Sequence, residues 1–157
     1  MQLYFLRHAQ AEDGEGDDQQ RNLTPQGKKR AEKLARVMAA LGLQPAHIYS
    51  SPRVRAHQTA VIVAAALHLP VEVREEVNLD FNQQAVEYLI ADLDPSDEVL
   101  FVGHEPSLSS VVQELTGAAI TMKRGSLARV DLYHYKPLRG KLVWLIAPKV
   151  FEVLGGK

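Results

Sequence analysis

The stretch LYFLRH, residues 3–8, decides how the rest of the chain can be interpreted. Its first four residues are apolar and predict a short buried strand, and Arg7 and His8 follow it directly. The same order recurs at residues 47–55, where HIYS runs into SPRVR, and at residues 99–104, where VLFV runs into Gly-His. Buried strands that end in polar residues, with other segments between them, indicate an α/β domain.

The segments between these strands carry the apolar periodicity of helices. Thr24-Pro25 matches an N-cap and a first helical residue, apolar residues then repeat at helical spacing over residues 31–41, and Gly42 ends the helix. Ser51-Pro52 repeats the cap-and-proline pattern, so we predict a second helix start there. Further predicted elements are helices over residues 54–67, 86–93 and 108–115 and a short strand over residues 71–73.

The last part of the chain predicts antiparallel strands. Residues 128–135 alternate between apolar and polar, residues 142–147 form a last strand, and residues 136–141 suit a hairpin between them. A hairpin joins antiparallel neighbours, so the sheet is mixed but mainly parallel. The chain has 157 residues without a repeat or linker. We therefore expect one domain over residues 1–157, a three-layer α/β/α sandwich with a mainly parallel mixed sheet.

Composition argues against several classes of function. The net charge is −1 and there is no cysteine, which removes disulfides, thiolate metal sites and cysteine nucleophiles. The apolar run 3–6 is too short for the core of a signal peptide, and no window approaches the roughly 18 apolar residues of a membrane span. We expect a cytoplasmic protein that binds neither nucleic acid nor membrane. We also expect a monomer with no cofactor and no metal.

Residues 11–20 form an acidic loop that contains Glu12, Asp13, Glu15, Asp17 and Asp18. Its charge predicts a solvated surface segment. The alternative, a calcium-binding loop, lacks the regular acidic spacing and the closing glutamate of that motif.

The polar residues after the strands suit one kind of ligand. The carboxyl ends of parallel strands gather at one edge of a sheet, so Arg7, His8, Arg55 and His104 should converge there. Arginine offers a planar fork of donors that matches phosphate oxygens, and neutral histidine can act as a nucleophile. Helix starts after Ser51 and after Glu105 would add backbone donors. These residues together predict a basic pocket for a phosphoryl dianion.

At this point the sequence resembles the histidine phosphatase superfamily, which has the phosphoglycerate-mutase-like fold. Residues 6–9, LRHA, resemble its Arg-His-Gly signature, and residues 51–60, SPRVRAHQTA, resemble its Ser-Pro-x-x-Arg-Ala-x-Gln-Thr-Ala block. Residues 102–105, VGHE, resemble its Gly-His element, and residues 21–27, RNLTPQG, resemble the Leu-Thr-x-x-Gly stretch that opens the first helix. The short length is similar to that of the phosphohistidine phosphatase (SixA-type) branch.

The resemblance implies roles for particular residues. His8 would be phosphorylated, Arg7 and Arg55 would clamp the phosphoryl oxygens, and His104 would support the transition state. It also suggests that Arg21 reaches the pocket. The predicted catalytic residues are then His8, Arg7, Arg55 and His104, and the predicted substrate-binding residues are Arg7, Arg21, Ser51, Arg55 and His104.

The sequence departs from the family pattern in two places. Ala9 replaces the usual glycine of the signature, and we expect this smallest change to be tolerated. The acidic proton donor of larger relatives has no recognisable counterpart. Glu75, Glu76 and Asp80 lie in the corresponding region, but we interpret them as surface carboxylates.

The missing acid favours phosphohistidine on a protein as the substrate. An alcohol leaving group needs protonation, whereas imidazole, with an unperturbed pKa of about 6.5, leaves with little help near neutral pH. Two alternatives stay open at this point. One is a phosphatase of small phosphoesters such as sugar phosphates, and the other is a non-catalytic phosphate-binding regulatory module.

Overall fold

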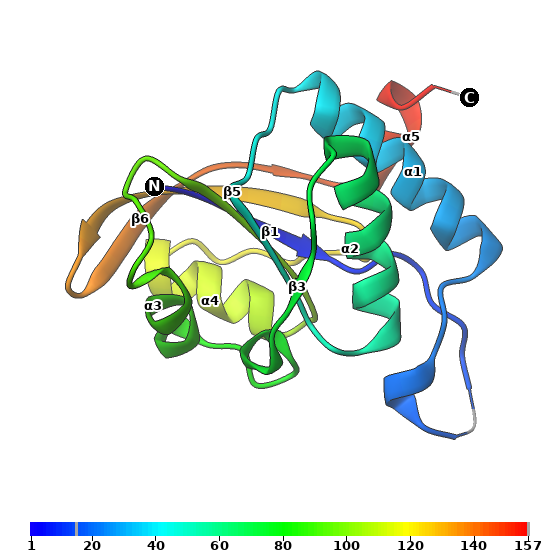
Figure 1. The fold of residues 1–157 in the computed structure, drawn as a ribbon, viewed down its shortest axis with the longest axis horizontal. Helices are drawn as coiled ribbons and strands as arrows, with labels where there is room; N and C mark the ends of the chain where they lie inside the picture. The colour runs from blue at the N-terminus through cyan, green and yellow to red at the C-terminus, as the bar shows by residue number, and fades with distance from the viewer. Residues whose placement is uncertain (15, 157) are drawn as a thin grey trace.

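The computed structural model describes residues 1–14 and 16–156, which form a six-stranded sheet with helices on both faces (Figure 1). The strand order across the sheet is β3-β2-β4-β1-β5-β6. The first four strands in that order are parallel, and β5 and β6 run antiparallel to their inner neighbours. The strands are β1 (Gln2–Arg7), β2 (His47–Ser50), β3 (Glu72–Val73), β4 (Glu98–Gly103), β5 (Leu127–Tyr135) and β6 (Leu138–Ile146).

The helices divide into two groups that cover opposite faces of the sheet. Two short 3-10 turns, η1 (Asp18–Gln20) and η2 (Glu75–Val77), lie in the connections. The core on one face involves the first, second and last α-helices, and the core on the other face involves the third and fourth. These helices are α1 (Pro25–Ala40), α2 (Val54–Leu67), α3 (Gln83–Ile90), α4 (Ser107–Thr116) and α5 (Pro148–Leu154).

The apolar run of β1 is explained by burial on both of its faces. Alternate side chains point to opposite sides of a strand, so Leu3 and Phe5 pack towards α3 and α4, and Tyr4 and Leu6 pack towards α1 and α2. Strand β1 lies between β4 and β5, and its last residue, Arg7, is in register with Gly103. The predicted three-layer sandwich with a mainly parallel mixed sheet is confirmed.

The predicted helix start at Ser51-Pro52 is wrong. Helix α2 begins at Val54, with Arg53 at the N-cap and no side-chain cap. The Ser51 hydroxyl instead accepts a hydrogen bond from the Arg53 N–H at 3.2 Å and contacts the ring of His104 at 2.7 Å. The residues that looked like a cap therefore form a turn after β2. This turn contacts His104, just beyond the end of the neighbouring strand β4.

The last helix, α5, was absent from the predicted elements, and β6 begins at Leu138, four residues before the predicted strand. Pro148 at the first helical position was the available signal. Phe151 is the buried residue of this seven-residue helix, so the apolar periodicity was too short to detect. Glu152 ties the helix to α1 through ion pairs with Arg30 and Lys33.

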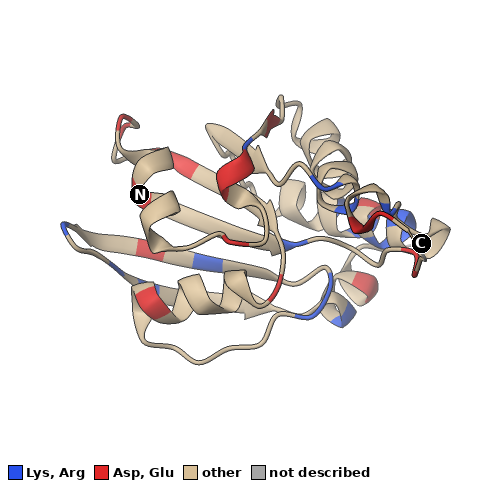
Figure 2. Ribbon diagram, turned by 90° about the horizontal axis from the view of Figure 1, so that it is seen from below, with Lys and Arg blue, Asp and Glu red and all other residues tan. Residues whose placement is uncertain are grey.

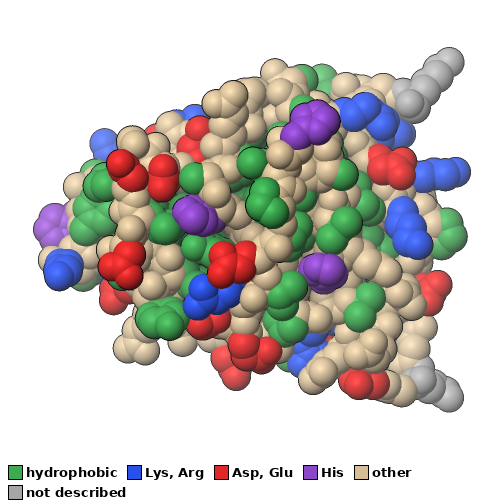
Figure 3. All heavy atoms as spheres, in the orientation of Figure 1, with side chains coloured by type: hydrophobic (Ala, Val, Ile, Leu, Met, Phe, Trp, Pro, Cys, Tyr) green, Lys and Arg blue, Asp and Glu red, His purple; other side chains and the backbone are tan. Residues whose placement is uncertain are grey.

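Lys and Arg are interspersed with Asp and Glu along the ribbon (Figure 2), and charges of both signs lie among apolar side chains on the face that Figure 3 displays. Among the described helices, none is both long and apolar enough to cross a bilayer.

Gly27 marks the closest approach between α1 and the segment that follows β1. A Cβ atom at this position would lie 2.1 Å from the carbonyl oxygen of Gln10. That carbonyl also accepts the Thr24 N–H at 3.0 Å, and the Thr24 hydroxyl caps the helix by accepting the Gly27 N–H at 2.9 Å. The glycine thus lets the start of α1 lie directly against the segment after β1 that carries His8.

We predict that Gly27→Ala lowers the free energy of unfolding by about 1–3 kcal/mol. The steric overlap outweighs the gain of about 1 kcal/mol that alanine gives in an ordinary helix position. Urea denaturation followed by circular dichroism measures this change. Gln26→Ala, at an exposed position of the same turn, is the control and should change stability little. A Gly27→Ala protein as stable as the wild type would contradict the close contact.

Candidate active site

His8 is held in one orientation just beyond the end of β1. Its backbone N–H donates to the carbonyl oxygen of Gly103 at 3.1 Å, which ties it to the end of β4. Its ring Nδ1 lies 2.7 Å from the carbonyl oxygen of Ala9. Because a carbonyl only accepts, Nδ1 carries the proton of the neutral ring, and Nε2 keeps its lone pair. The Arg55 Nε–H donates to that lone pair at 3.3 Å.

Burial keeps both site histidines neutral at pH 7. Burial, with the nearby Arg55 and Arg7 charges, lowers the pKa of His8 to about 4. Burial, with the neighbouring His8 and Arg55, lowers the pKa of His104 to about 3. The two ring centroids are 5.3 Å apart. The positive charge of the site therefore comes from arginines. From the sequence, the histidines were also expected to contribute positive charge.

His104 follows β4 and is oriented by Ser51. The ring Nε2 lies 2.7 Å from the Ser51 hydroxyl, and that hydroxyl already accepts the Arg53 N–H. If the hydroxyl donates its proton to Nε2, the ring carries its own proton on Nδ1. Nδ1 is buried with no hydrogen-bond partner. Ser51 itself is fully buried, so its hydroxyl serves His104.

Arg7 and Arg55 approach His8 from two sides. Arg7 donates from Nη1 to the carbonyl oxygen of Met122 at 3.0 Å, and its Nε is buried without a partner. Arg55 donates from Nη1 to the backbone carbonyl oxygen of Asp18 at 2.8 Å. Burial lowers the pKa of both guanidinium groups, but their ordinary pKa is so high that both stay charged.

The Gln-Thr-Ala part of the second sequence block holds this geometry together. The Thr59 hydroxyl accepts the Ala9 N–H at 3.1 Å and donates to the carbonyl oxygen of Arg55 at 2.8 Å. Gln58 accepts the Leu23 N–H at 2.8 Å. One turn of α2 thereby fixes the segment after His8, the backbone of Arg55 and the entry to α1. The methyl group of Ala9 is buried in a small apolar cluster, where it is accommodated.

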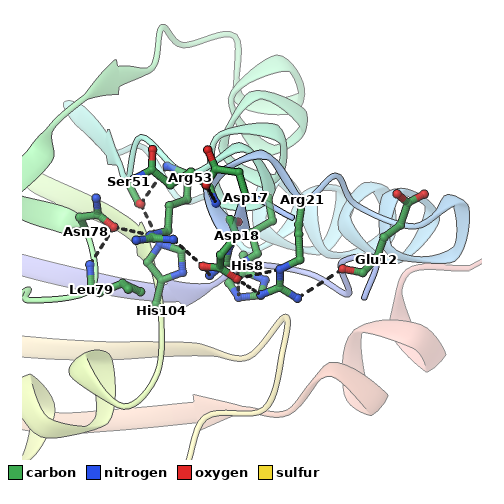
Figure 4. A network of polar contacts seen from close by, with 12 residues as sticks. His8, Glu12, Asp17, Asp18, Arg21, Ser51, Arg53, Asn78, Leu79 and His104 are labelled. Atoms are coloured by element: carbon green, nitrogen blue, oxygen red, sulfur yellow. Dashed lines mark hydrogen bonds and ion pairs between the residues drawn. The ribbon is translucent and has the colours of Figure 1, made fainter. Parts of the chain in front are cut away.

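Asp18 is a site residue that sequence reasoning missed. Its carboxylate contacts Arg21 Nη2 at 2.7 Å and Arg55 Nη2 at 3.2 Å, and it also pairs with Arg53 (Figure 4). Burial would raise the pKa of this carboxyl, but the Arg55 and Arg21 charges outweigh it and hold the pKa below its ordinary value. The acidic loop was interpreted as a solvated segment, and Glu15 within it lies outside the described residues. The charge of the loop did not indicate that the half-exposed Asp18 side chain faces the arginines of the site.

A cavity of about 230 Å³ opens over His8, and we term it the catalytic cavity. It brings together the predicted Arg7, His8, Arg21, Arg55 and His104, and it adds residues that the sequence analysis did not select. The complete lining is Arg7, His8, Ala11, Arg21, Arg55, Leu79, His104, Glu105 and Arg124. Arg124 lies in an irregular segment without a motif, so nothing in the sequence marked it.

The carboxylates near residue 80 do not line the catalytic cavity. Glu76 pairs with Arg74 at 3.0 Å, and Glu75 accepts a hydrogen bond from Asn78 at 2.8 Å. Asp80 is also absent from the lining. Glu105 does line it, but its carboxylate accepts hydrogen bonds from Ser109 and from the Met122 N–H. Within residues 1–14 and 16–156, no three side chains of metal-ligating type are grouped to hold a metal ion.

Known proteins resemble this chain in sequence and in fold. A model of the histidine phosphatase superfamily (branch 1) matches residues 3–78, which include β1, the His8 signature and the Arg55 block. The structure of the protein histidine phosphatase SixA complexed with tungstate superimposes with a TM-score of 0.86. The two are 26% identical, and the alignment covers 96% of this chain and 99% of that chain. The chain belongs to the histidine phosphatase superfamily.

Other superfamily structures share the fold at lower identity. A protein from Agrobacterium tumefaciens that carries the name phosphohistidine phosphatase SixA is 24% identical, with a TM-score of 0.77 over 94% of this chain and 98% of that chain. A mycobacterial glucosyl-3-phosphoglycerate phosphatase is 19% identical, with a TM-score of 0.76 over 93% and 99%. This chain thus has about the same length as the two SixA structures.

One curated relative is similar over part of its length. An uncharacterized protein of Picosynechococcus is 44% identical over 68 residues, which are 42% of this chain and 41% of that protein. The chain therefore matches about two-fifths of the length of that relative.

We predict that Asp18→Asn strengthens the binding of orthophosphate by about threefold to tenfold. The carboxylate competes with an incoming dianion for Arg55 and Arg21, and one like charge in a half-exposed site is worth about 1 kcal/mol. Isothermal titration calorimetry measures the dissociation constant. Asp13→Asn, in the same loop, makes the same change of charge as a control. Weaker binding by Asp18→Asn would mean that Asp18 organises the arginines instead of competing for them.

We predict that the free energy of unfolding falls by about 3 kcal/mol between pH 6.5 and pH 4 because of His8 alone. The unfolded chain binds a proton near pH 6.5, but the folded state takes it up only near pH 4, so acid favours unfolding across this window. Urea denaturation at several pH values measures the slope. His8→Gln removes one of the titrating groups and should reduce the slope by the share of His8, while His104 keeps its own contribution. A slope that His8→Gln leaves unchanged would show that the pKa of His8 is not lowered by folding.

Proposed function

We propose that this protein is a phosphatase in which His8 is the nucleophile and forms a phosphohistidine intermediate. The observation that carries the proposal is the state of the His8 ring, which is neutral, protonated at Nδ1 and unprotonated at Nε2, whose lone pair accepts only the long hydrogen bond from the Arg55 Nε–H at 3.3 Å. A nitrogen lone pair among Arg7, Arg55 and Arg21 can attack a phosphorus atom whose oxygens those arginines hold.

In the first step, Nε2 of His8 forms a bond to phosphorus while the bond to the leaving group breaks. The His8 ring becomes positively charged, and the Ala9 carbonyl oxygen, which accepts from Nδ1, stabilises that charge. Arg7 and Arg55 bind the equatorial oxygens, and the Nδ1–H of His104 donates to one of them. Stabilising charge on these oxygens is the main contribution of a protein to phosphoryl transfer.

In the second step, water attacks phosphorus and the bond to Nε2 breaks. The electron pair returns to Nε2, so His8 regains its neutral state with the proton still on Nδ1. Both hydrogens of the water leave with orthophosphate. Positioning and the fixed positive charges account for this step, and the residues of the site themselves supply those charges.

The substrate that the site favours is phosphohistidine on a protein. Asp18 is ionised and paired, Glu105 is engaged as an acceptor, and Glu75, Glu76 and Asp80 lie away from the catalytic cavity. No carboxyl group among the described residues is thus set to protonate an alkoxide. Imidazole leaves as a neutral molecule when its other nitrogen is protonated, so it does not need such a donor. The similarity to a protein histidine phosphatase supports the same substrate.

A phosphatase of small phosphoesters is the second candidate. A mycobacterial glucosyl-3-phosphoglycerate phosphatase has the same fold, but at 19% identity this likeness concerns the fold alone. A non-catalytic phosphate-binding module is the third. The unprotonated Nε2 of His8 argues against it, because a pure binding site gains nothing from a nucleophile.

We predict that the wild type releases phosphate rapidly from a histidine-phosphorylated protein and slowly from p-nitrophenyl phosphate. His8→Ala removes the attacking atom and should abolish both activities, whereas His57→Ala on α2 should retain them as a matched control. Phosphate release and acid-labile labelling of the protein measure turnover and the intermediate. Turnover of the ester alone would favour a small-molecule phosphatase, and phosphate binding without turnover would favour the binding module.

A further inference from the structure

A second cavity, of about 310 Å³, lies beside the catalytic cavity between α1, α5 and the segment that precedes β5. We term it the basic cavity. It shares Arg7 and Arg124 with the catalytic cavity, so the two cavities are adjacent. Its other lining residues that matter here are Gln10, Arg30, Lys123, Pro148 and Phe151. A substrate that is much larger than its phosphoryl group therefore lies within reach of this second cavity.

The rim of the basic cavity carries positive charge that is only partly paired within the described part of the chain. Arg30 is paired with Glu152 at 3.1 Å, and Glu152 also binds Lys33. Within residues 1–14 and 16–156, neither the Lys123 nor the Arg124 side chain takes part in a hydrogen bond or an ion pair. The Arg124 charge also contributes to lowering the pKa of Arg7, after burial. Two unpaired cations beside a third, paired one favour an anionic ligand.

The interior of the basic cavity adds apolar and hydrogen-bonding features. Ala31, Leu34, Pro148 and Phe151 contribute an apolar wall. Gln10 is also a lining residue, and its Oε1 atom is buried and has no hydrogen-bond donor among the described residues. A buried acceptor without a partner is uncommon and is satisfied when a ligand brings an N–H group. The cavity thus suits a ligand with an anionic group, an apolar group and an N–H donor.

The turn that carries Lys123 and Arg124 is fastened to the nucleophile segment. The Gly125 N–H donates to the carbonyl oxygens of Arg7 and His8, at 3.1 and 3.0 Å. Gly125 has φ +82°, a left-handed conformation that glycine adopts without strain. The Ser126 N–H closes the turn on the Lys123 carbonyl oxygen at 2.8 Å. The backbone of Lys123 and Arg124 is therefore at a fixed position relative to His8.

We infer that the basic cavity binds an acidic segment of polypeptide that flanks the phosphorylated residue of the substrate. An Asp or Glu side chain pairs with Lys123 and Arg124, an apolar side chain packs against Phe151 and Pro148, and a backbone N–H donates to Gln10. A polypeptide carries all three groups at once, whereas a second phosphate would use only the cations. This inference rests on the proposed function, because it names the kind of protein that the phosphatase selects.

Lys123→Glu tests the inference, since Lys123 lines the basic cavity but not the catalytic cavity. The substrates are a phosphohistidine peptide with acidic and leucine residues on both sides and its analogue with Asn and Gln in place of the acids. We expect Lys123→Glu to lower kcat/KM for the acidic peptide by about tenfold. We expect little change for the neutral peptide and for p-nitrophenyl phosphate. Lys141→Glu on β6 controls for the change of net charge.

Binding of the unphosphorylated peptides to His8→Ala separates this inference from the proposed function. We expect the acidic peptide to bind more tightly than the neutral one and to lose that advantage in the His8→Ala, Lys123→Glu double variant. Equal binding of both peptides, or an equal loss for all three substrates in Lys123→Glu, would overturn the inference. Preference for the acidic peptide without turnover of phosphohistidine would count against the proposed function and leave the binding site standing.

Discussion

The hydrogen bond from Nδ1–H of His8 to the Ala9 carbonyl oxygen is the interaction on which the site depends. A neutral imidazole has one ring proton, and this bond places it away from the catalytic cavity, so that Nε2 is left to react. The acceptor is itself fixed, because the Ala9 N–H donates to Thr59, and Thr59 donates to the backbone of Arg55. The nucleophile and the main cation of the site are thus set by one chain of hydrogen bonds.

The carboxylate of Asp18 offsets part of the positive charge of the site. Asp18 occupies guanidinium groups that a phosphoryl group would use, and the two histidines stay neutral through burial. An arriving dianion therefore exchanges places with a carboxylate instead of entering an unscreened cluster of charge. In the adjacent basic cavity, Lys123 and Arg124 have no such partner among residues 1–14 and 16–156, and Lys123 lines this cavity alone.

Local sequence patterns predicted the elements that carry the site, and they failed where tertiary contacts decide. The apolar runs of β1, β2 and β4 lie on buried strands, so their positions were predictable from sequence. Ser51 looked like a helix cap, but its hydroxyl binds His104, which is distant in sequence. Asp18 and Arg124 reach the site through an irregular loop and a turn, and neither conformation has a periodic signature. The strand ends predicted that Arg7, His8, Arg55 and His104 converge, and the resemblance suggested their roles. Their distances and hydrogen-bond partners came only from the fold.

The two edges of the sheet differ in what they offer to another extended chain. Strand β3 at one edge has two residues and presents few free backbone groups. Strand β6 at the other edge has nine residues, and Arg139 and Lys141 lie along it. Long edges are templates for strand addition, and basic side chains disfavour it by repulsion. Strand addition is therefore disfavoured by shortness at one edge and by charge at the other, and high salt weakens only the second effect.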